Sequence, residues 1–140
     1  MKQLTVFIEN RIGRLEEVTT ILANNNINIV SISLSDTGEY GMLRMLVSQP
    51  AEACKALSES GFSAMLTDVV AVKLIHHFGE LNRLTNTISS NGIDIKYMYA
   101  LQSGEDAAIV LKTSDDTRCK ELLKAKGDFE VLRAVDVYNL

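Results

Sequence analysis

Two periods of hydrophobicity alternate along the chain. Residues 4–8 and 70–74 alternate between apolar and polar side chains, which predicts a β-strand in each segment. Each strand is followed by apolar residues at the spacing of one helical face. These are Ile12, Leu15, Val18, Ile21 and Leu22 after the first strand, and Phe78, Leu81, Leu84 and Ile88 after the second. The pattern therefore predicts a strand followed by a helix at the start of each half.

The ends of these helices and the later elements are also marked. Asn26 and Gly92 suit the left-handed position after a helix, and Ile27 and Ile93 follow at the spacing of a Schellman contact. The first half then predicts strands at 29–35 and 42–47, a helix at about 50–60 and a strand at about 63–69. The second half predicts the same elements at 95–101, 107–112, 115–126 and 129–138. Gly38 and Gly104 are predicted at hairpin turns, and Gly61 and Gly127 close the second helices.

The two halves form an internal repeat with an offset of 66 residues. Matching residues are Gly13 and Gly79, Leu15 and Leu81, Ile27 and Ile93, Ile29 and Ile95, Gly38 and Gly104, and Gly61 and Gly127. Residues 1–68 and 69–140 are therefore interpreted as two homologous units. Each is predicted to be an α+β, ferredoxin-like βαββαβ unit, an antiparallel four-stranded sheet with helices on one face.

Both faces of the predicted sheets carry apolar side chains. In the first half, one face is assigned Leu4, Val6, Ile8, Val30, Ile32 and Leu34, and the other Phe7, Leu43, Met45 and Val47. A unit of this size buries a small core. We therefore expect the two units to pack together and the chain to form a homodimer.

Composition and charge exclude several classes of function. The chain is 46% hydrophobic and 23% charged, a globular composition, and its net charge of −4 is spread over both halves. Without a basic stripe, nucleic acid is not an expected partner. We expect no signal peptide, no membrane span and a cytoplasmic location. Motifs for phosphate loops, dinucleotides, zinc proteases and serine hydrolases do not occur, and no cofactor is expected.

The remaining reactive residues favour structural roles. Cys54 and Cys119 lie in the predicted second helices and form no metal-binding or redox pair. His76 and His77 point apart on an extended segment, so solvated loop histidines are favoured over a metal site or catalysis. The acidic pairs at residues 16–17 and 115–116 fit the first turns of helices.

One segment suggests binding. The loop between the first strand and helix contains Gly13 in the first half and Gly79 in the second. Glycine there either permits a tight turn or lets a ligand approach the helix N-terminus, whose free N–H groups favour a carboxylate. Both interpretations remain open from the residues alone.

The pattern Asn10-x-x-Gly13-x-Leu15-x-x-Val18-x-x-x-Leu22, followed by Ile27-Asn28-Ile29, resembles the ACT domain, a regulatory module of amino-acid metabolism. The second copy runs from Gly79-x-Leu81 to Ile93-Asp94-Ile95, so the resemblance covers the chain twice. The family motif usually begins Asp-x-Pro-Gly, whereas this chain has Asn10 and Ile12 in the first copy and His76 and Phe78 in the second.

The resemblance implies a small-molecule effector, usually an amino acid, bound between two ACT units. It places the ligand near the first loop of one unit and the second strand of the other. The implied first-unit residues are Asn10, Arg11, Ile12, Gly13, Arg14 and Leu15, with Ser31, Ser33 and Leu34. The implied second-unit residues are His76, His77, Phe78, Gly79, Glu80 and Leu81, with Tyr97, Met98 and Tyr99.

Simple chemistry is compatible with that placement. The N–H groups of residues 13–15 or 79–81 suit a carboxylate, and Asn10 with strand carbonyls suits an ammonium group. Arg11, Arg14 and Glu80 either select the ligand side chain or stay solvated, and solvation is favoured. Tyr97 and Tyr99 share one strand face, opposite Met98, and either line a pocket or pack.

The sequence thus predicts a non-enzymatic tandem ACT protein that senses an amino acid and transmits binding allosterically. One alternative is a regulatory subunit of a separate enzyme of amino-acid metabolism, with no essential ligand of its own. A remote alternative is an enzyme on the same fold, for which His76, His77 and Glu80 are the candidate residues.

Overall fold

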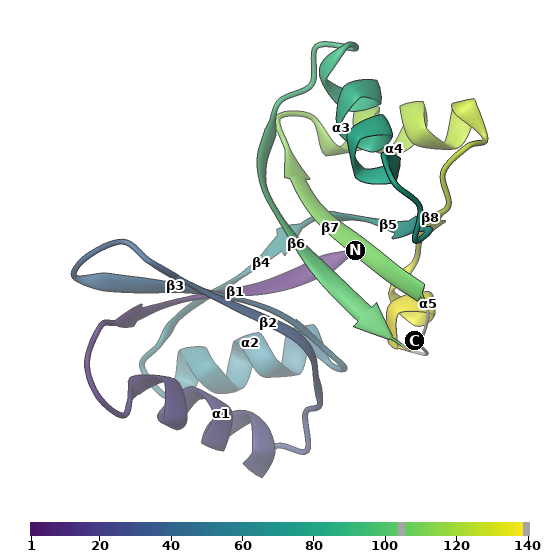
Figure 1. Cartoon of the computed structure of the whole chain (residues 1–140). Coiled ribbons are helices and arrows are strands. Elements are labelled where there is room, and N and C mark those ends of the chain that lie inside the picture. The colour runs from purple at the N-terminus through teal and green to yellow at the C-terminus, as the bar shows by residue number, and fades with distance from the viewer. Residues whose placement is uncertain (104–105, 139–140) are drawn as a thin grey trace. The chain divides into compact units, whose positions relative to one another are not determined.

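A computed structural model describes residues 1–103 and 106–138, which fold into two compact units (Figure 1). The N-terminal unit is Lys2–Thr67, and the C-terminal unit consists of Met1 with Asp68–Leu140. Each unit has its own buried core, and the two cores share no residue. None of the helices in the described ranges has the length and hydrophobicity required to cross a membrane.

The N-terminal unit has the predicted βαββαβ order. Its strands are hydrogen-bonded in the order β2-β3-β1-β4, and both helices cover one face of the sheet (Figure 1). The elements are β1 (Lys2–Glu9), α1 (Arg14–Asn24), β2 (Ile29–Asp36), β3 (Tyr40–Val47), α2 (Pro50–Glu59) and β4 (Ser63–Asp68). Ile12 precedes α1 and is fully exposed, so its predicted place on the helical face is wrong.

The C-terminal unit repeats this topology, with strand order β6-β7-β5-β8. Its elements are β5 (Val70–Leu74), α3 (Glu80–Ser89), β6 (Ile95–Ser103), β7 (Asp106–Thr113), α4 (Asp116–Lys126), β8 (Val131–Leu132) and α5 (Ala134–Tyr138). Phe78, like Ile12, lies outside the helix and is fully exposed. The ferredoxin-like fold class predicted for both halves is confirmed.

The predicted strand at 129–138 is wrong, because only two of its residues are strand and a short helix follows. The Asp136 carboxylate accepts a hydrogen bond from the backbone N–H of Arg133 (2.9 Å) and pairs with its guanidinium (3.1 Å). Residues three apart are neighbours on a helix and lie on opposite faces of a strand. The Arg133–Asp136 pair therefore stabilises α5, and Val137 is buried.

The assignment of apolar residues to sheet faces also needs correction. Leu4 pairs with Met45 and Val6 with Leu43, and directly paired residues project from the same face. Leu43, Met45 and Val47 thus lie in the same core as Leu4, Val6 and Ile8. The register of β2 shifts at Val30, so that Ile29 and Ile32 pair with Val47 and Met45 on one sheet face although they are three residues apart, and Ile32 remains 47% exposed.

The predicted helix ends are confirmed in both units. Asn26 has φ 56° and Gly92 has φ 75°. The N–H of Ile27 donates to the carbonyl of Leu22 (2.9 Å), and that of Ile93 donates to Ile88 (3.3 Å). These are the hydrogen bonds of a Schellman motif, and all four apolar side chains are buried. Gly38 has positive φ in its hairpin as predicted, whereas Gly104 lies outside the described residues.

Candidate functional site

The loop before the first helix has the same backbone geometry in both units. Gly13 (φ 90°) and Gly79 (φ 85°) cap α1 and α3 in the left-handed conformation. A side chain other than glycine is strained at such φ values. A Cβ atom built on either glycine would meet no atom within 4 Å. The turn therefore requires glycine, and the space beside both glycines is open.

The N-termini of α1 and α3 lack side-chain caps. The first helical N–H groups, of Arg14 and Glu80, make long bonds to Arg11 (3.4 Å) and His77 (3.3 Å). Within the described residues, the next N–H groups, those of Leu15 and Leu81, have no acceptor. Two uncapped helix N-termini are thus available to an anion.

A cavity of about 220 Å³ opens beside this loop in the N-terminal unit. It brings together four predicted residues: Asn10, Arg11 and Leu15 from the loop and helix, and Leu34 from β2. Ile8, Glu9, Ser35, Asp36 and Gly41 complete the lining. Ile12, Gly13 and Arg14 are near it in sequence but do not line it.

Polar contacts fix the shape of the N-terminal cavity. The Asn10 amide nitrogen donates to the Gly38 carbonyl (3.0 Å) and to the Asp36 carboxylate (3.3 Å), which leaves the amide oxygen of Asn10 as an acceptor. Arg11 pairs with Glu9 at 2.8 Å. The Asn10 contacts join the first loop to the β2–β3 turn, and the Arg11–Glu9 pair joins it to the end of β1.

The C-terminal unit has a larger cavity, of about 590 Å³, at the equivalent loop. It brings together five predicted residues, His76, His77, Phe78, Gly79 and Leu81. Leu74, Ile75 and Asn82 complete the lining. Both histidines lie in the loop after β5, as predicted.

Arg14 and Glu80 line neither of these two cavities, and each is partly buried by contacts within its own unit. The Arg14 side chain is 18% exposed, pairs with Glu17 (2.6 Å) and lies 4.3 Å from the centre of the Phe62 ring. Glu80 is 21% exposed and pairs with Arg83 (3.0 Å), whose guanidinium lies 4.3 Å from the centre of the Phe129 ring. The hydrogen bond from Arg83 lowers the pKa of Glu80. Both residues brace the start of their helix.

The predicted strand residues lie on two faces. Ser31 and Ser33 pair with Leu46 and Arg44, on the face opposite Leu34. Met98 packs against the C-terminal core, and Tyr97 and Tyr99 lie on the other face, as predicted. Ser31, Ser33, Tyr97, Met98 and Tyr99 do not line the two loop cavities.

His, Cys, Asp and Glu are the other side chains that could hold a metal or react. No group of three His, Cys, Asp or Glu residues there is placed to hold a metal. Burial raises the pKa of the Cys119 thiol to about 11, so this thiol is protonated at neutral pH. Cys119 aligns with Ala53, and both are buried in the core of their unit.

Sequence reasoning missed the cavity residues outside the loop motif. A Cβ atom on Gly41 would lie 3.1 Å from Leu34 and 3.3 Å from Ile8, so this glycine lets their side chains close the cavity wall. A glycine inside a strand was the available signal. Ile75 and Asn82 had no signal of their own.

The two-unit architecture agrees with comparisons to known proteins. Residues 1–136 match the model of the ACT domain pair family, so the chain belongs to that family and the resemblance is confirmed. No curated protein sequence matches the chain. A Bacteroides thetaiotaomicron protein of known crystal structure is 38% identical, with 99% of this chain and 96% of that chain covered and a TM-score of 0.92.

Two solved structures share the fold at lower identity. The ligand-free regulatory subunit of aspartate kinase from Thermus thermophilus is 16% identical, with 89% of this chain and 91% of that chain covered and a TM-score of 0.63. The regulatory subunit of aspartate kinase from Thermus flavus is 19% identical, with 89% and 88% covered and a TM-score of 0.62.

Proposed function

We propose that this protein is a non-catalytic regulatory protein that binds a free amino acid at the loop before the first helix. Membership of the ACT domain pair family supports a regulatory role. The observation that carries the proposal is the coincidence, in both units, of an uncapped helix N-terminus, a glycine with open space beside it, and a cavity. The two free cysteines fit a reducing, cytoplasmic setting.

The chemistry of an amino acid matches the groups at these loops. Its carboxylate is placed at the helix N-terminus, where the N–H of Leu15 or Leu81 lacks an acceptor. In the N-terminal unit, the free amide oxygen of Asn10 accepts from the ammonium group. Dissociation constants from about 10 µM to 1 mM need only about −4 to −7 kcal/mol, which a small polar site provides.

Transmission requires a partner. In the proposal, the protein is a homodimer, and a ligand that binds one arrangement of ACT units more tightly shifts the population towards it. The second candidate function is a regulatory subunit for a separate enzyme of amino-acid metabolism. It is favoured by Ile12 and Phe78, two fully exposed apolar side chains at equivalent loop positions.

A thermal-shift screen against the twenty amino acids at several millimolar each tests the proposal. A ligand at 100 times its dissociation constant stabilises the folded state by about 2.7 kcal/mol, which raises Tm by several degrees. Gly13→Ala and Gly79→Ala, each compared with its own ligand-free Tm, assign the site to one loop. If no amino acid raises the Tm of the folded protein, amino-acid sensing is contradicted, and the role of a regulatory subunit is the better-supported function.

A further inference from the structure

The cavity at residues 74–82 has an unusually simple lining. Leu74, Ile75, Phe78 and Leu81 supply apolar side chains, and the polar groups are the two imidazoles and the Asn82 amide. Among the described residues that line it, none is Asp, Glu, Lys or Arg. Its volume of about 590 Å³ falls within the range of small-molecule sites, which are mostly apolar with a few polar groups.

Glu80 follows Gly79 directly but does not line this cavity. Its carboxylate accepts two hydrogen bonds from the Arg83 guanidinium, at 3.0 and 3.3 Å. Arg83 in turn contacts the Phe129 ring and Asp128. The carboxylate at the start of α3 is thereby paired, and it lines a separate cavity together with Ile75 and Phe129.

The equivalent cavity of the N-terminal unit is smaller and charged. Its volume is about 220 Å³, and Glu9, Arg11 and Asp36 line it. Arg11 and Glu9 pair with each other, and Asp36 accepts hydrogen bonds from Asn10 and from the Gly38 N–H. The two loops share a backbone geometry but offer different surroundings to a ligand side chain.

We propose that the cavity at residues 74–82 selects free amino acids with a large apolar side chain, such as leucine or phenylalanine, and that Phe78 covers that side chain. This inference rests on the proposed function and specifies the ligand class of one of its two loops. Phe78 is fully exposed, and Ile75 and Leu81 are 56% and 42% exposed. A bound apolar side chain would therefore remove existing apolar surface from water.

The same lining discriminates against charged side chains. An ammonium in this cavity would lose water and meet no carboxylate, and a carboxylate would meet only the two imidazoles and the Asn82 amide among apolar side chains. Leucine, asparagine and aspartate have similar shapes, so they separate polarity from size. Alanine has the same α-carboxylate and α-ammonium groups as leucine but a smaller side chain. Its affinity therefore tests the effect of size, because missing methylenes in an apolar pocket weaken binding roughly tenfold or more.

The first experiment is calorimetric titration of the full chain with leucine, phenylalanine, asparagine, aspartate, lysine and alanine. We expect leucine or phenylalanine to bind at least about tenfold more tightly than the other four. Equal or tighter binding of aspartate, asparagine or lysine that Phe78→Ser weakens overturns the selectivity but leaves amino-acid sensing intact. No binding of any of the six overturns the selectivity, and a flat thermal-shift screen of all twenty amino acids overturns both.

The second experiment locates the site. Phe78→Ser is expected to weaken leucine or phenylalanine binding about tenfold without changing the fold, because the side chain is fully exposed. The matched control is Val135→Ser, which removes an exposed apolar side chain from α5 in the same unit. If Phe78→Ser binds as tightly as Val135→Ser, the cavity at residues 74–82 is not the site.

Discussion

In both ACT units, the first helix begins with an ion pair between an arginine and a glutamate, and the arginine lies over a phenylalanine ring. The positions of the arginine and the glutamate are exchanged between the two units. In the N-terminal unit, Arg14 pairs with Glu17 and lies over the Phe62 ring. At the aligned positions of the C-terminal unit, Glu80 pairs with Arg83, and it is Arg83 that lies over Phe129. The guanidinium lies 4.3 Å from the ring centre in both. The two units thus brace the helix start with the same kinds of group, an acid, an arginine and a phenylalanine, in opposite orders of charge.

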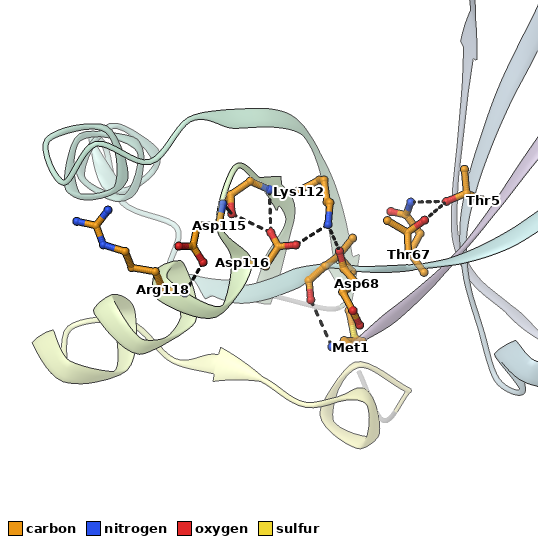
Figure 2. A network of polar contacts seen from close by, with 11 residues as sticks. Met1, Thr5, Thr67, Asp68, Lys112, Asp115, Asp116 and Arg118 are labelled. Carbon is orange, nitrogen blue, oxygen red and sulfur yellow. Dashed lines mark hydrogen bonds and ion pairs between the residues drawn. The ribbon is translucent and has the colours of Figure 1, made fainter.

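The second helices differ more deeply. α2 begins with Pro50, whose fixed φ suits the first helical position, and its N-cap Gln49 makes no side-chain cap. α4 begins with two carboxylates: Asp115 accepts from the N–H of Arg118, and Asp116 bonds to Lys112 and Thr113 (Figure 2). The start of α2 therefore depends on the fixed φ of a proline, and the start of α4 depends on two carboxylates.

The largest expected loss of stability comes from truncating a core leucine that the two units share. Leu57 and Leu123 are the same residue at aligned positions, and both are fully buried. Leu57→Ala and Leu123→Ala should each lower the free energy of unfolding by about 2–5 kcal/mol, because each leaves a cavity in its core. Urea unfolding of the two variants measures this. A cost below about 1 kcal/mol for either one would show that the two cores do not support their units equally.

This equivalence explains how much of the fold could be read from the sequence. The ends of α1 and α3 could be predicted, because a Schellman motif depends only on local spacing and on one residue in the left-handed conformation. The residues that form it are Leu22 and Ile27 in α1, and Ile88 and Ile93 in α3. Sheet faces could not be read in the same way. The register shift at Val30 changes which residues of β2 face the core, and no local signal marks it.

The candidate site was predictable as a loop but not as a set of contacts. The loop was predictable from Gly13 and Gly79, because glycine is the residue that adopts positive φ without strain. The role of Arg14 was not predictable, since it depends on Phe62, which is 48 residues away in the sequence. Long-range contacts of this kind decide which charged side chains remain open to a ligand.

Exchanging the charges of Arg14 and Glu17 tests whether the order of the ion pair affects stability. Arg14→Glu should lower the free energy of unfolding by roughly 1–2 kcal/mol, because it removes the ring contact and places two carboxylates one turn apart. Adding Glu17→Arg recreates the order of Glu80 and Arg83 and should recover at least about half of the loss. Chemical denaturation of both variants measures the recovery. If the double variant is no more stable than Arg14→Glu, the two helix starts are not interchangeable.

A smaller difference is expected between the caps of the second helices. Asp115→Ala should cost about 1 kcal/mol, because its carboxylate caps α4. Gln49→Ala at the aligned position of α2 should cost close to nothing, since Gln49 makes no side-chain cap. Equilibrium unfolding in urea compares the pair. Equal costs would contradict the view that only α4 depends on a carboxylate cap.

The smallest expected effect is a pH dependence confined to α4. Burial raises the pKa of Asp116, but hydrogen bonds from Lys112 and Thr113 outweigh it, so the pKa of Asp116 is lower than its ordinary value. A lowered pKa means that the carboxylate stabilises the fold above about pH 4 and that this contribution disappears as the pH falls through the folded-state pKa. Wild-type protein should therefore lose more stability between pH 6 and pH 3 than Asp116→Asn.

Amide exchange separates this effect from the titration of other carboxylates. Acidification should lower amide protection, taken relative to the intrinsic exchange rate at each pH, more in the first turn of α4 than in the first turn of α2, because Pro50, at the position aligned with Asp116, does not titrate. Asp116→Asn should reduce that difference between the two helices. If acid loosens both helix starts alike, the carboxylates at α4 are not what distinguishes it from the helix that begins with proline.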